Sequence, residues 1–425
     1  MAVTATDTHR AIEAVFRIEQ AKLIAGLARM LRDVGFAEEL AQDALLTALE
    51  QWPRAGIPEK PGAWLMAAAK NRAIDRLRRA KLIERKHEEL GREIDEAQDT
   101  AAELEAALDD DIGDDLLRLM FTACHPVLST EARVALTLRL LGGLTIEEIA
   151  RAFLVPEPTI AQRIVRAKRI LAEKQVPFEV PRGSDRAERL ASVLGVLYLV
   201  FNEGYSATAG GDWIRPQLCA EALRLGRVLV GLAPGEPEAH GLVALMEIQA
   251  SRLKARVGAD GEPILLLDQD RARWDWLLIR RGLAALARAE ALEGPPGPYQ
   301  LQAALAACHA RARTAEETDW AQIVGLYGAL AELAPSPVVE LNRAVALGML
   351  FGPEAGLRIV DALAAEASLK SYHLLPSVRG DFLKKLGRLD EARAEFERAA
   401  ALTRNERERR LLLDRAAACT ERRAD

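Results

Sequence analysis

The chain has 425 residues, a net charge of −6, 50% hydrophobic residues and only 5% aromatic residues. Its length allows about two or three domains with buried cores, and a composition rich in Ala, Leu, Arg and Glu predicts an all-α fold. Four widely spaced cysteines argue against a disulfide framework and a zinc site; with a polar N-terminus and no apolar run of spanning length, they predict a cytoplasmic protein without a membrane segment.

Apolar residues at helical spacing predict two helices at the start of the chain. The first covers residues 12–34 and is closed by Gly35, and the second covers residues 40–52 and ends before Pro53. Residues 53–63 hold three prolines and two glycines, which predicts a loop.

A third predicted helix begins near Ala63 and becomes strongly basic along its length. Trp64 and Asn71 share one face, and an arginine cluster follows them at residues 72–85. An aromatic ring and an amide ahead of arginines suit a surface that binds phosphates and captures an exposed base. The alternative is that Trp64 belongs to the core and the arginines form a solvated face.

The charge balance inverts over residues 88–115, which are rich in Asp and Glu. Such a weakly apolar acidic stretch predicts a flexible tether, with screening of the basic faces as a further hypothesis. More helix follows over residues 116–141, interrupted at His125 and Pro126. The adjacent Cys124 and His125 have no partner at a useful spacing, so a structural role is favoured over a ligand or nucleophile.

Residues 144–171 predict a short capped helix, a tight break and a second helix. Thr145 and Glu148 form a capping box, and the second helix starts near Glu157 after the break at residues 154–156. Polar and basic residues lie opposite its apolar side: Thr159, Gln162, Arg163, Arg166 and Arg169. This pattern is typical of major-groove readout, although an ordinary helical hairpin with a solvated basic face gives the same pattern.

The two modules, in this order across an acidic tether, resemble the extracytoplasmic-function (ECF) sigma factors, the bacterial subunits that direct RNA polymerase to promoters. AEELAQDALLTALEQW resembles the family's polymerase-clamp-binding helix, KPGAWLMAAAKNRAIDRLRR its promoter-melting and minus-ten-reading helix, and LTIEEIARAFLVPEPTIAQRIVRAKRIL its minus-thirty-five-reading helix-turn-helix. The resemblance covers residues 12–173 and implies core RNA polymerase and promoter DNA as partners.

The resemblance also implies a role for individual residues. The residues that would face the polymerase clamp are Leu40, Gln42, Asp43 and Leu46. Those implied at the minus-ten strand are Trp64 and Asn71, with Arg72, Arg76 and Arg79 on the phosphates. The residues implied in the minus-thirty-five groove are Thr159, Gln162, Arg163 and Arg166, with Arg169 on the same basic face. Departures from the family pattern at Leu154, Pro158, Ala161 and Gln162 leave the promoter sequence open.

The C-terminal half is predicted to be a helical-repeat domain. LGRLDEARAEFERAAAL resembles the second helix of a tetratricopeptide repeat, and an earlier unit lies about 34 residues upstream. FNEGYSA, LLDQDRARWD and GPYQLQAALAACHA resemble the subgroup of ECF sigma factors with a large helical extension. Four charged residues of the second segment could line a pocket or contact polymerase: Asp268, Asp270, Arg271 and Asp275.

The predicted organisation has five parts. They are residues 1–87 as sigma region 2, 88–112 as the acidic linker, 113–175 as sigma region 4, 176–188 as a hinge and 189–425 as the tetratricopeptide-like extension. The predicted function is promoter-specific initiation with core polymerase, regulated through the extension by a protein or a ligand. The alternatives are a polymerase-independent DNA-binding regulator with a sensing domain, and an enzyme or scaffold with a vestigial N-terminal half.

An enzyme would have to use polar residues of the C-terminal half as acid–base groups: Glu203, Asp268, Asp270, His309 and His373. No nucleophile motif, phosphate loop or metal-ligand spacing accompanies them, so buried structural networks are the better interpretation. We therefore expect no enzymatic activity, no cofactor and no metal.

Overall fold

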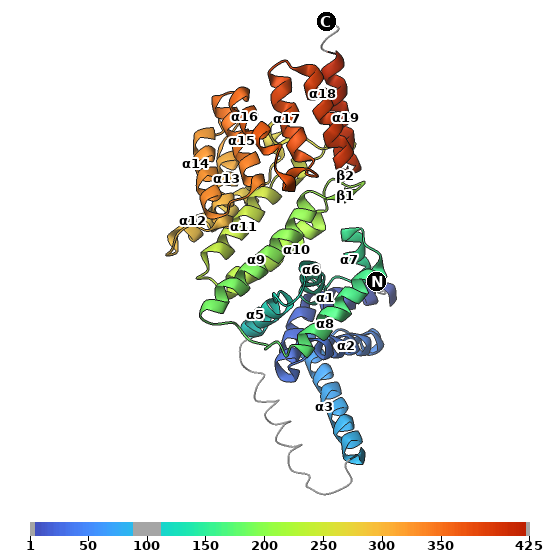
Figure 1. Cartoon of the computed structure of the whole chain (residues 1–425). Coiled ribbons are helices and arrows are strands. Elements are labelled where there is room, and N and C mark those ends of the chain that lie inside the picture. Colours follow the sequence, from blue (N-terminus) through green and yellow to red (C-terminus); the bar gives the residue numbers. More distant parts are fainter. Residues whose placement is uncertain (1–4, 88–111, 422–425) are drawn as a thin grey trace. The chain divides into compact units, whose positions relative to one another are not determined.

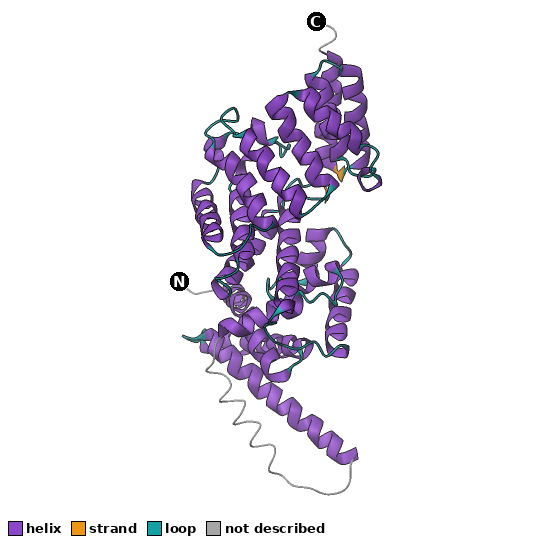
Figure 2. Cartoon of the chain, turned by 60° about the vertical axis from the view of Figure 1, so that its left-hand side comes forward, coloured by secondary structure: helices purple, strands orange, loops and turns teal. Residues whose placement is uncertain are grey.

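The computed structural model describes residues 5–87 and 112–421, with side chains at 9–76 and 114–420. Nearly all regular structure in these ranges is helical, as Figures 1 and 2 show, so the all-α prediction is confirmed. The chain divides into two compact units, Met1–Val196 and Leu197–Asp425. Among the described helices, none has the length and apolar character that crossing a bilayer would need.

The first unit contains two groups of helices. Its elements are α1 (Ala5–Leu31), α2 (Val34–Ala55), α3 (Pro61–His87), α5 (Ile112–Ala123), α6 (Thr130–Leu140), α7 (Ile146–Phe153), α8 (Glu157–Glu173) and the first part of α9 (Ser184–Tyr205). We call α1–α3 the first module and α5–α8 the second module. The predicted acidic linker lies outside the described residues except for its last residue, which begins α5, and α9 starts inside the predicted hinge.

Two predicted helix boundaries in the first module were wrong. The first helix ends at Leu31 rather than at Gly35, because the Asp33 side chain accepts a hydrogen bond from the Phe36 N–H at 3.0 Å and starts α2 there. Gly35 therefore lies within α2. At its other end α2 continues through Pro53 to Ala55, and the Gly56 N–H closes it on the Trp52 carbonyl.

The second unit is built from successive antiparallel helix pairs. Its elements are the end of α9, then α10 (Pro216–Leu232), α11 (Pro237–Ala250), α12 (Trp276–Ala291), α13 (Pro298–Arg311), α14 (Trp320–Leu333), α15 (Pro337–Phe351), α16 (Pro353–Leu363), α17 (Leu374–Lys385), α18 (Leu389–Leu402) and α19 (Glu406–Glu421). Short 3-10 turns η1 (Leu253–Ala255), η2 (Leu266–Asp268), η3 (Arg271–Arg273) and η4 (Ala367–Leu369) connect them, with strands β1 (Ala209–Gly210) and β2 (Arg404–Asn405).

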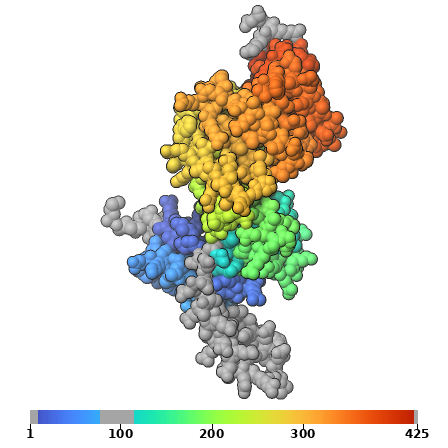
Figure 3. Space-filling view, turned by 90° about the vertical axis from the view of Figure 1, so that its left-hand side faces the viewer, coloured from blue at the N-terminus to red at the C-terminus, as the bar shows by residue number. Residues whose placement is uncertain are grey.

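Small residues let neighbouring helix pairs of this unit approach closely. A Cβ atom added to Gly380 of α17 would lie 2.7 Å from the Phe396 ring of α18, and one added to Gly348 or Gly356 would lie 2.3 Å from the Phe382 ring. These contacts join the helix pair α15–α16 to the pair α17–α18, so the two predicted repeats stack as consecutive units. On the face shown in Figure 3, the helices coloured orange and red form one continuous surface.

Asn405, late in the sequence, forms hydrogen bonds with the segment that follows α9. Asn405 is fully buried, and its amide donates to the carbonyl oxygens of Ala207 at 3.0 Å and Asp212 at 2.8 Å. Strands β1 and β2 pair in parallel beside it. The end of the FNEGYSA segment is therefore held by a residue about 200 positions later in the sequence.

Candidate nucleic-acid interface

Helices α7 and α8 form the helix-turn-helix that the sequence predicts. The Thr145 hydroxyl accepts from the Glu148 N–H at 3.1 Å, and the Glu148 carboxylate accepts from the Thr145 N–H at 2.8 Å. This capping box fixes the start of α7. Leu154 ends the helix in the left-handed region with φ 51° and ψ 44°, a conformation that costs a residue with a Cβ atom about 1 kcal/mol. The turn orients α8 rigidly.

The apolar face of α8 packs into the second module, and a mixed face points away from it. Ile160, Ile164, Ala167 and Leu171 are buried. The exposed side chains of the outer face are Pro158, Gln162, Val165, Arg166 and Arg169, whereas Thr159 and Arg163 lie half-buried on its flank. Of the predicted groove residues, three therefore lie on the outer face and two beside it.

Val165 is the outer-face residue that the sequence reasoning missed. Its side chain is 66% exposed although it is β-branched and apolar. The helical spacing from Gln162 and Arg169 would have placed it on their face. Val165 was predicted neither as a core residue nor as a DNA-contact residue, because only polar and basic residues were considered as DNA contacts on that face.

The two predicted base-capturing residues of α3 differ in exposure. Trp64 is half-buried and packs edge-on against the buried Trp52, with ring centroids 5.2 Å apart. Asn71 is exposed. Trp64 therefore anchors α3 to the core and still presents part of its ring, which combines the two interpretations that the sequence left open.

The predicted phosphate-binding arginines of α3 form ion pairs with α2. Arg76 donates to Asp43 at 2.8 Å and lies 3.4 Å from Glu39, and Arg72 lies 3.5 Å from Asp43. The Arg76 guanidinium also lies over the Phe36 ring. The side chain of Arg79 lies outside the described residues. These cations are thus partly neutralised by carboxylates of the same module.

The predicted polymerase-binding residues of α2 differ in accessibility. Leu46 is 56% exposed, and Gln42 and Asp43 are half-buried. Leu40, by contrast, is fully buried because it shares the core face of α2 with Ala37 and Ala44. Its side chain cannot reach a partner in this structure, so we remove Leu40 from the candidate surface.

A buried ionic cluster joins the two modules. Glu38 of α2 is 2% exposed and accepts from Arg139 of α6 at 2.7 Å, and it also pairs with Lys168 of α8. We call these three residues the Glu38 cluster. A carboxylate at this depth is stable only with such partners, so the cluster fixes α8 beside α2.

Two further ion pairs join the first module to the second module. Arg17 of α1 pairs with Glu148 at 2.6 Å, which ties the first module to the capping box of α7. Arg29 of α1 pairs with Asp115 of α5 at 3.0 Å. Burial raises the pKa of the Asp115 carboxyl, although Arg29 and Arg118 act in the opposite direction. Within the described residues the two modules are therefore packed together.

In the second unit, two of the segments that carry the family likeness meet. Arg271 of η3 donates to the carbonyl oxygens of His309 at 2.7 Å and Ala312 at 2.5 Å, at the C-terminal end of α13. The Trp274 ring lies against the guanidinium groups of Arg271 and Arg252, 4.8 and 5.0 Å from its centroid. A cation at a helix C-terminus is favourable, so Arg271 has a structural role.

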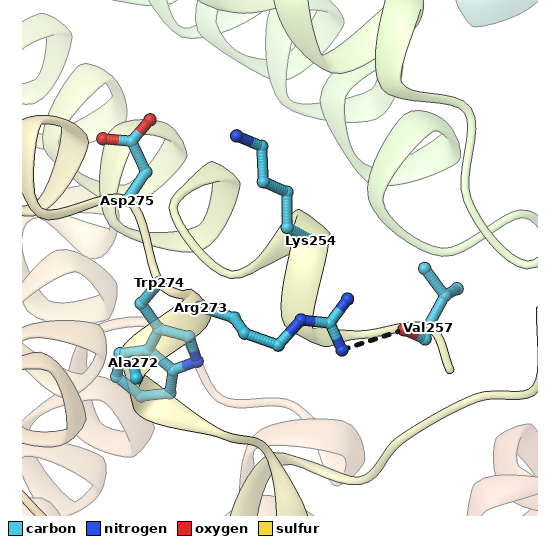
Figure 4. Close-up of a pocket in the computed structure, with 6 residues that line it drawn as sticks. All are labelled: Lys254, Val257, Ala272, Arg273, Trp274 and Asp275. Atoms are coloured by element: carbon cyan, nitrogen blue, oxygen red, sulfur yellow. Dashed lines mark hydrogen bonds between the residues drawn. The ribbon is translucent and has the colours of Figure 1, made fainter. Parts of the chain in front are cut away.

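An open pocket of about 620 Å³ lies beside this arrangement (Figure 4). Lys254, Arg273, Trp274 and Asp275 are among its lining residues, and Arg273 reaches the Val257 carbonyl at 3.5 Å. Asp275 is engaged as the cap of α12. Of the four charged residues predicted to line a pocket, Asp275 lies at this one, and Arg273 of the same segment lines it as well.

The acid–base candidates are dispersed and have structural partners. Glu203 pairs with Arg215, Asp270 accepts from the Ala272 N–H, and His373 pairs with Glu408 at 2.9 Å. Burial lowers the pKa of His309 to about 3, so its ring is neutral at physiological pH. In the described ranges, no group of three or more His, Cys, Asp or Glu is arranged to hold a metal ion.

Comparison with known families agrees with this geometry. Residues 15–83 match Sigma-70 region 2 and residues 118–171 match Sigma-70, region 4. The chain is 33% identical over 148 residues to the ECF RNA polymerase sigma factor SigK of Mycobacterium tuberculosis (strain ATCC 25618 / H37Rv), covering 34% of this chain and 74% of that protein. The chain belongs to the ECF family of RNA polymerase sigma factors. The first module is therefore sigma region 2, and the second module is sigma region 4.

The likeness also extends beyond these two regions. Residues 189–290 match a family of unknown function, DUF6596. An uncharacterised protein of Rhizobium meliloti (strain 1021) is 47% identical over 397 residues, with 92% of each chain covered. The likeness to that protein therefore covers most of the helical extension as well as the two sigma regions.

Proposed function

We propose that this sigma factor binds core RNA polymerase and directs it to specific promoters in the cytoplasm. One feature supports this function above the others: a single compact unit presents an exposed Leu46 on α2, an exposed Asn71 on α3 and an exposed Gln162 on α8. These are the three surfaces that polymerase binding, strand opening and duplex recognition require.

In this proposal each helix has one task. Region 2 meets polymerase through Gln42, Asp43 and Leu46, while Trp64 and Asn71 of α3 capture a base of the opened minus-ten strand. Region 4 inserts α8 into the major groove at the minus-thirty-five element. Opening a base step costs a few kcal/mol, which the contacts to the captured base and the phosphates would offset.

The proposed function requires regions 2 and 4 to separate. Two promoter elements about 25 base pairs apart lie roughly 85 Å apart, since each base pair adds about 3.4 Å. In the structure a path from Arg72 through Asp43, Glu38 and Lys168 to Thr159 consists of two ion pairs and parts of two helices. That path is under about 50 Å long. The packed arrangement is therefore a closed state, and the Glu38 cluster must open before both elements can be bound.

We further propose that the helical extension regulates initiation by binding a protein or a ligand. Large apolar side chains are exposed on residues that lie close in sequence to the pocket-lining residues, and they include Leu265, Leu267, Trp276 and Leu277, the last two 50% and 49% exposed. Replacing Trp276 and Leu277 by alanine should change promoter output with an unaltered thermal unfolding profile. Unchanged output would remove this regulatory role from that surface.

The test of the main proposal is reconstitution of the full chain with core polymerase. We expect a stable holoenzyme that makes a few promoter positions reactive to permanganate, which modifies unpaired thymines. The double variant Asn71→Ala with Arg163→Ala should retain polymerase binding and lose promoter opening. If the chain does not bind core polymerase but binds duplex DNA without opening it, the polymerase-independent regulator is the correct function instead.

A further inference from the structure

The outer face of α8 has an apolar centre. Val165 lies three residues after Gln162 and four before Arg169, so the three side chains follow one line along the helix. Lys168 points towards α2, where it pairs with Glu38, whereas Val165 is 66% exposed. The region 2–region 4 junction therefore leaves Val165 uncovered.

Single exposed apolar residues are common on protein surfaces and need no explanation by themselves. The position of Val165 is what distinguishes it, because an amide and a guanidinium flank it on the helix that follows the rigid turn at Leu154. In a helix, the valine side chain occupies one rotamer in about 90% of cases. Its methyl groups therefore have a fixed direction and lose little entropy on contact.

In the major groove, thymine is distinguished by its C5 methyl group, and apolar side chains recognise that group by direct contact. Glutamine pairs with adenine through two hydrogen bonds. Val165 and Gln162 lie about 4.5 Å apart along the helix axis, which is between one and two base-pair steps of about 3.4 Å. One turn of α8 thus carries an amide and an apolar group at a spacing of one to two base pairs.

We propose that Val165 is a specificity-determining residue that contacts the methyl group of a thymine in the minus-thirty-five element, within two base pairs of an adenine read by Gln162. This inference rests on the proposed promoter function and adds to it the chemical class of the sequence that region 4 selects. Arg166 and Arg169, which follow on the same face of α8, supply phosphate contacts.

The test removes one methyl group at a time from the DNA. Each thymine of the minus-thirty-five element, in the promoter found by the reconstitution experiment, is replaced by deoxyuridine, and binding of the holoenzyme is measured by competition. At one position we expect about fourfold weaker binding, which corresponds to ~0.8 kcal/mol for one buried methyl group. The Val165→Ala variant should bind the thymine promoter about as weakly and should no longer respond to deoxyuridine at that position.

Ile18→Ala is the matched control, since it removes an equally exposed apolar side chain, 68% exposed, from α1. This variant should keep the full response to deoxyuridine. The inference is overturned if the wild-type holoenzyme opens the promoter yet tolerates deoxyuridine at every position, or if Val165→Ala keeps the response. If the wild-type holoenzyme opens no promoter, the proposed function fails and this inference fails with it.

Discussion

Helices α3 and α8 carry the two predicted DNA-contact surfaces, and the structure prepares them differently. The arginines of α3 that are described, Arg72 and Arg76, are held by Asp43 and Glu39 of α2. On α8, Arg166 is exposed, and Arg169 contacts only Glu173 of its own helix, at 3.5 Å, among the ion pairs of the described residues. Under the proposed function, the surface of α8 is thus ready to bind DNA, whereas the arginines of α3 must first exchange their carboxylate partners for phosphates.

Under the proposed function, this difference would couple polymerase binding to strand opening. Asp43 belongs to the candidate polymerase surface and is also the carboxylate that neutralises Arg72 and Arg76. A polymerase contact that engages Asp43 would release Arg72 and would leave Arg76 with Glu39 alone. The free sigma factor would then bind promoters weakly, because the cations at one of its two DNA-contact surfaces are occupied.

The largest expected effect concerns Glu38, which holds α8 beside α2. Glu38→Ala would leave Arg139 and Lys168 without their buried partner, at a cost of about 3 kcal/mol in the free energy of unfolding of the first unit. Faster hydrogen exchange in α6 and α8 would measure the loss. The neighbouring Glu39, whose side chain is 65% exposed in its ion pair with Arg76, is the control and should cost under about 0.5 kcal/mol when replaced by alanine. Equal effects of both variants would show that the Glu38 cluster does not hold the modules together.

The second largest effect is on promoter binding through the outer face of α8. Gln162→Ala should weaken holoenzyme binding to the promoter by about 2 kcal/mol, roughly thirtyfold, and relax the base preference at one position. Arg166→Ala should weaken binding about equally for all sequences, because a phosphate contact carries no base information. Competition with promoters altered at single positions separates the two. A uniform loss in both variants would mean that Gln162 reads no base.

The surface of α8 could be predicted from the sequence better than that of α3, whose arginines are paired with α2, and the reason is physical. The capping box at Thr145 and the break before Glu157 are local features, so α7 and α8 could be placed from spacing alone. The partner of Glu38, Arg139, is 101 residues away, and no local pattern shows that an acid on α2 is buried. The burial of Leu40 was missed for the same reason, since the helix pattern allows several core faces until the neighbouring helices are known.

The third effect is smaller and concerns the arginines of α3 that are paired with α2. Asp43→Asn should remove the carboxylate partner of Arg72 and one of the two carboxylates beside Arg76. The sigma factor without polymerase should then bind duplex DNA more tightly and with a salt slope steeper by about 1 to 2. Filter binding over a series of salt concentrations measures this slope. Glu50→Gln, at an exposed acid of the same helix, is the control for the change in net charge. Identical slopes for the two variants would contradict the coupling of α2 to α3.

The smallest expected effect concerns the buried thiol of Cys124 in region 4, whose reactivity should not change on promoter binding. Cys124 is 1% exposed, it contacts the Thr137 hydroxyl at 3.3 Å, and burial raises its thiol pKa to about 11. The thiol should therefore remain protonated and unreactive at pH 8 in the free protein and in the promoter complex. Mass spectrometry of peptides labelled by a thiol reagent would check this. Rapid labelling in the complex would show that region 4 loosens when it leaves region 2.

The separation of regions 2 and 4 on the promoter can be measured directly as a distance. The four native cysteines are buried, so cysteines introduced at the exposed Ala67 of α3 and Ala172 of α8 would take a fluorophore pair. Energy transfer should be efficient in the free sigma factor and should fall strongly in the open promoter complex, where the two elements lie roughly 85 Å apart. Undiminished transfer in a complex that initiates transcription would contradict the proposal that the closed unit opens to bind both promoter elements.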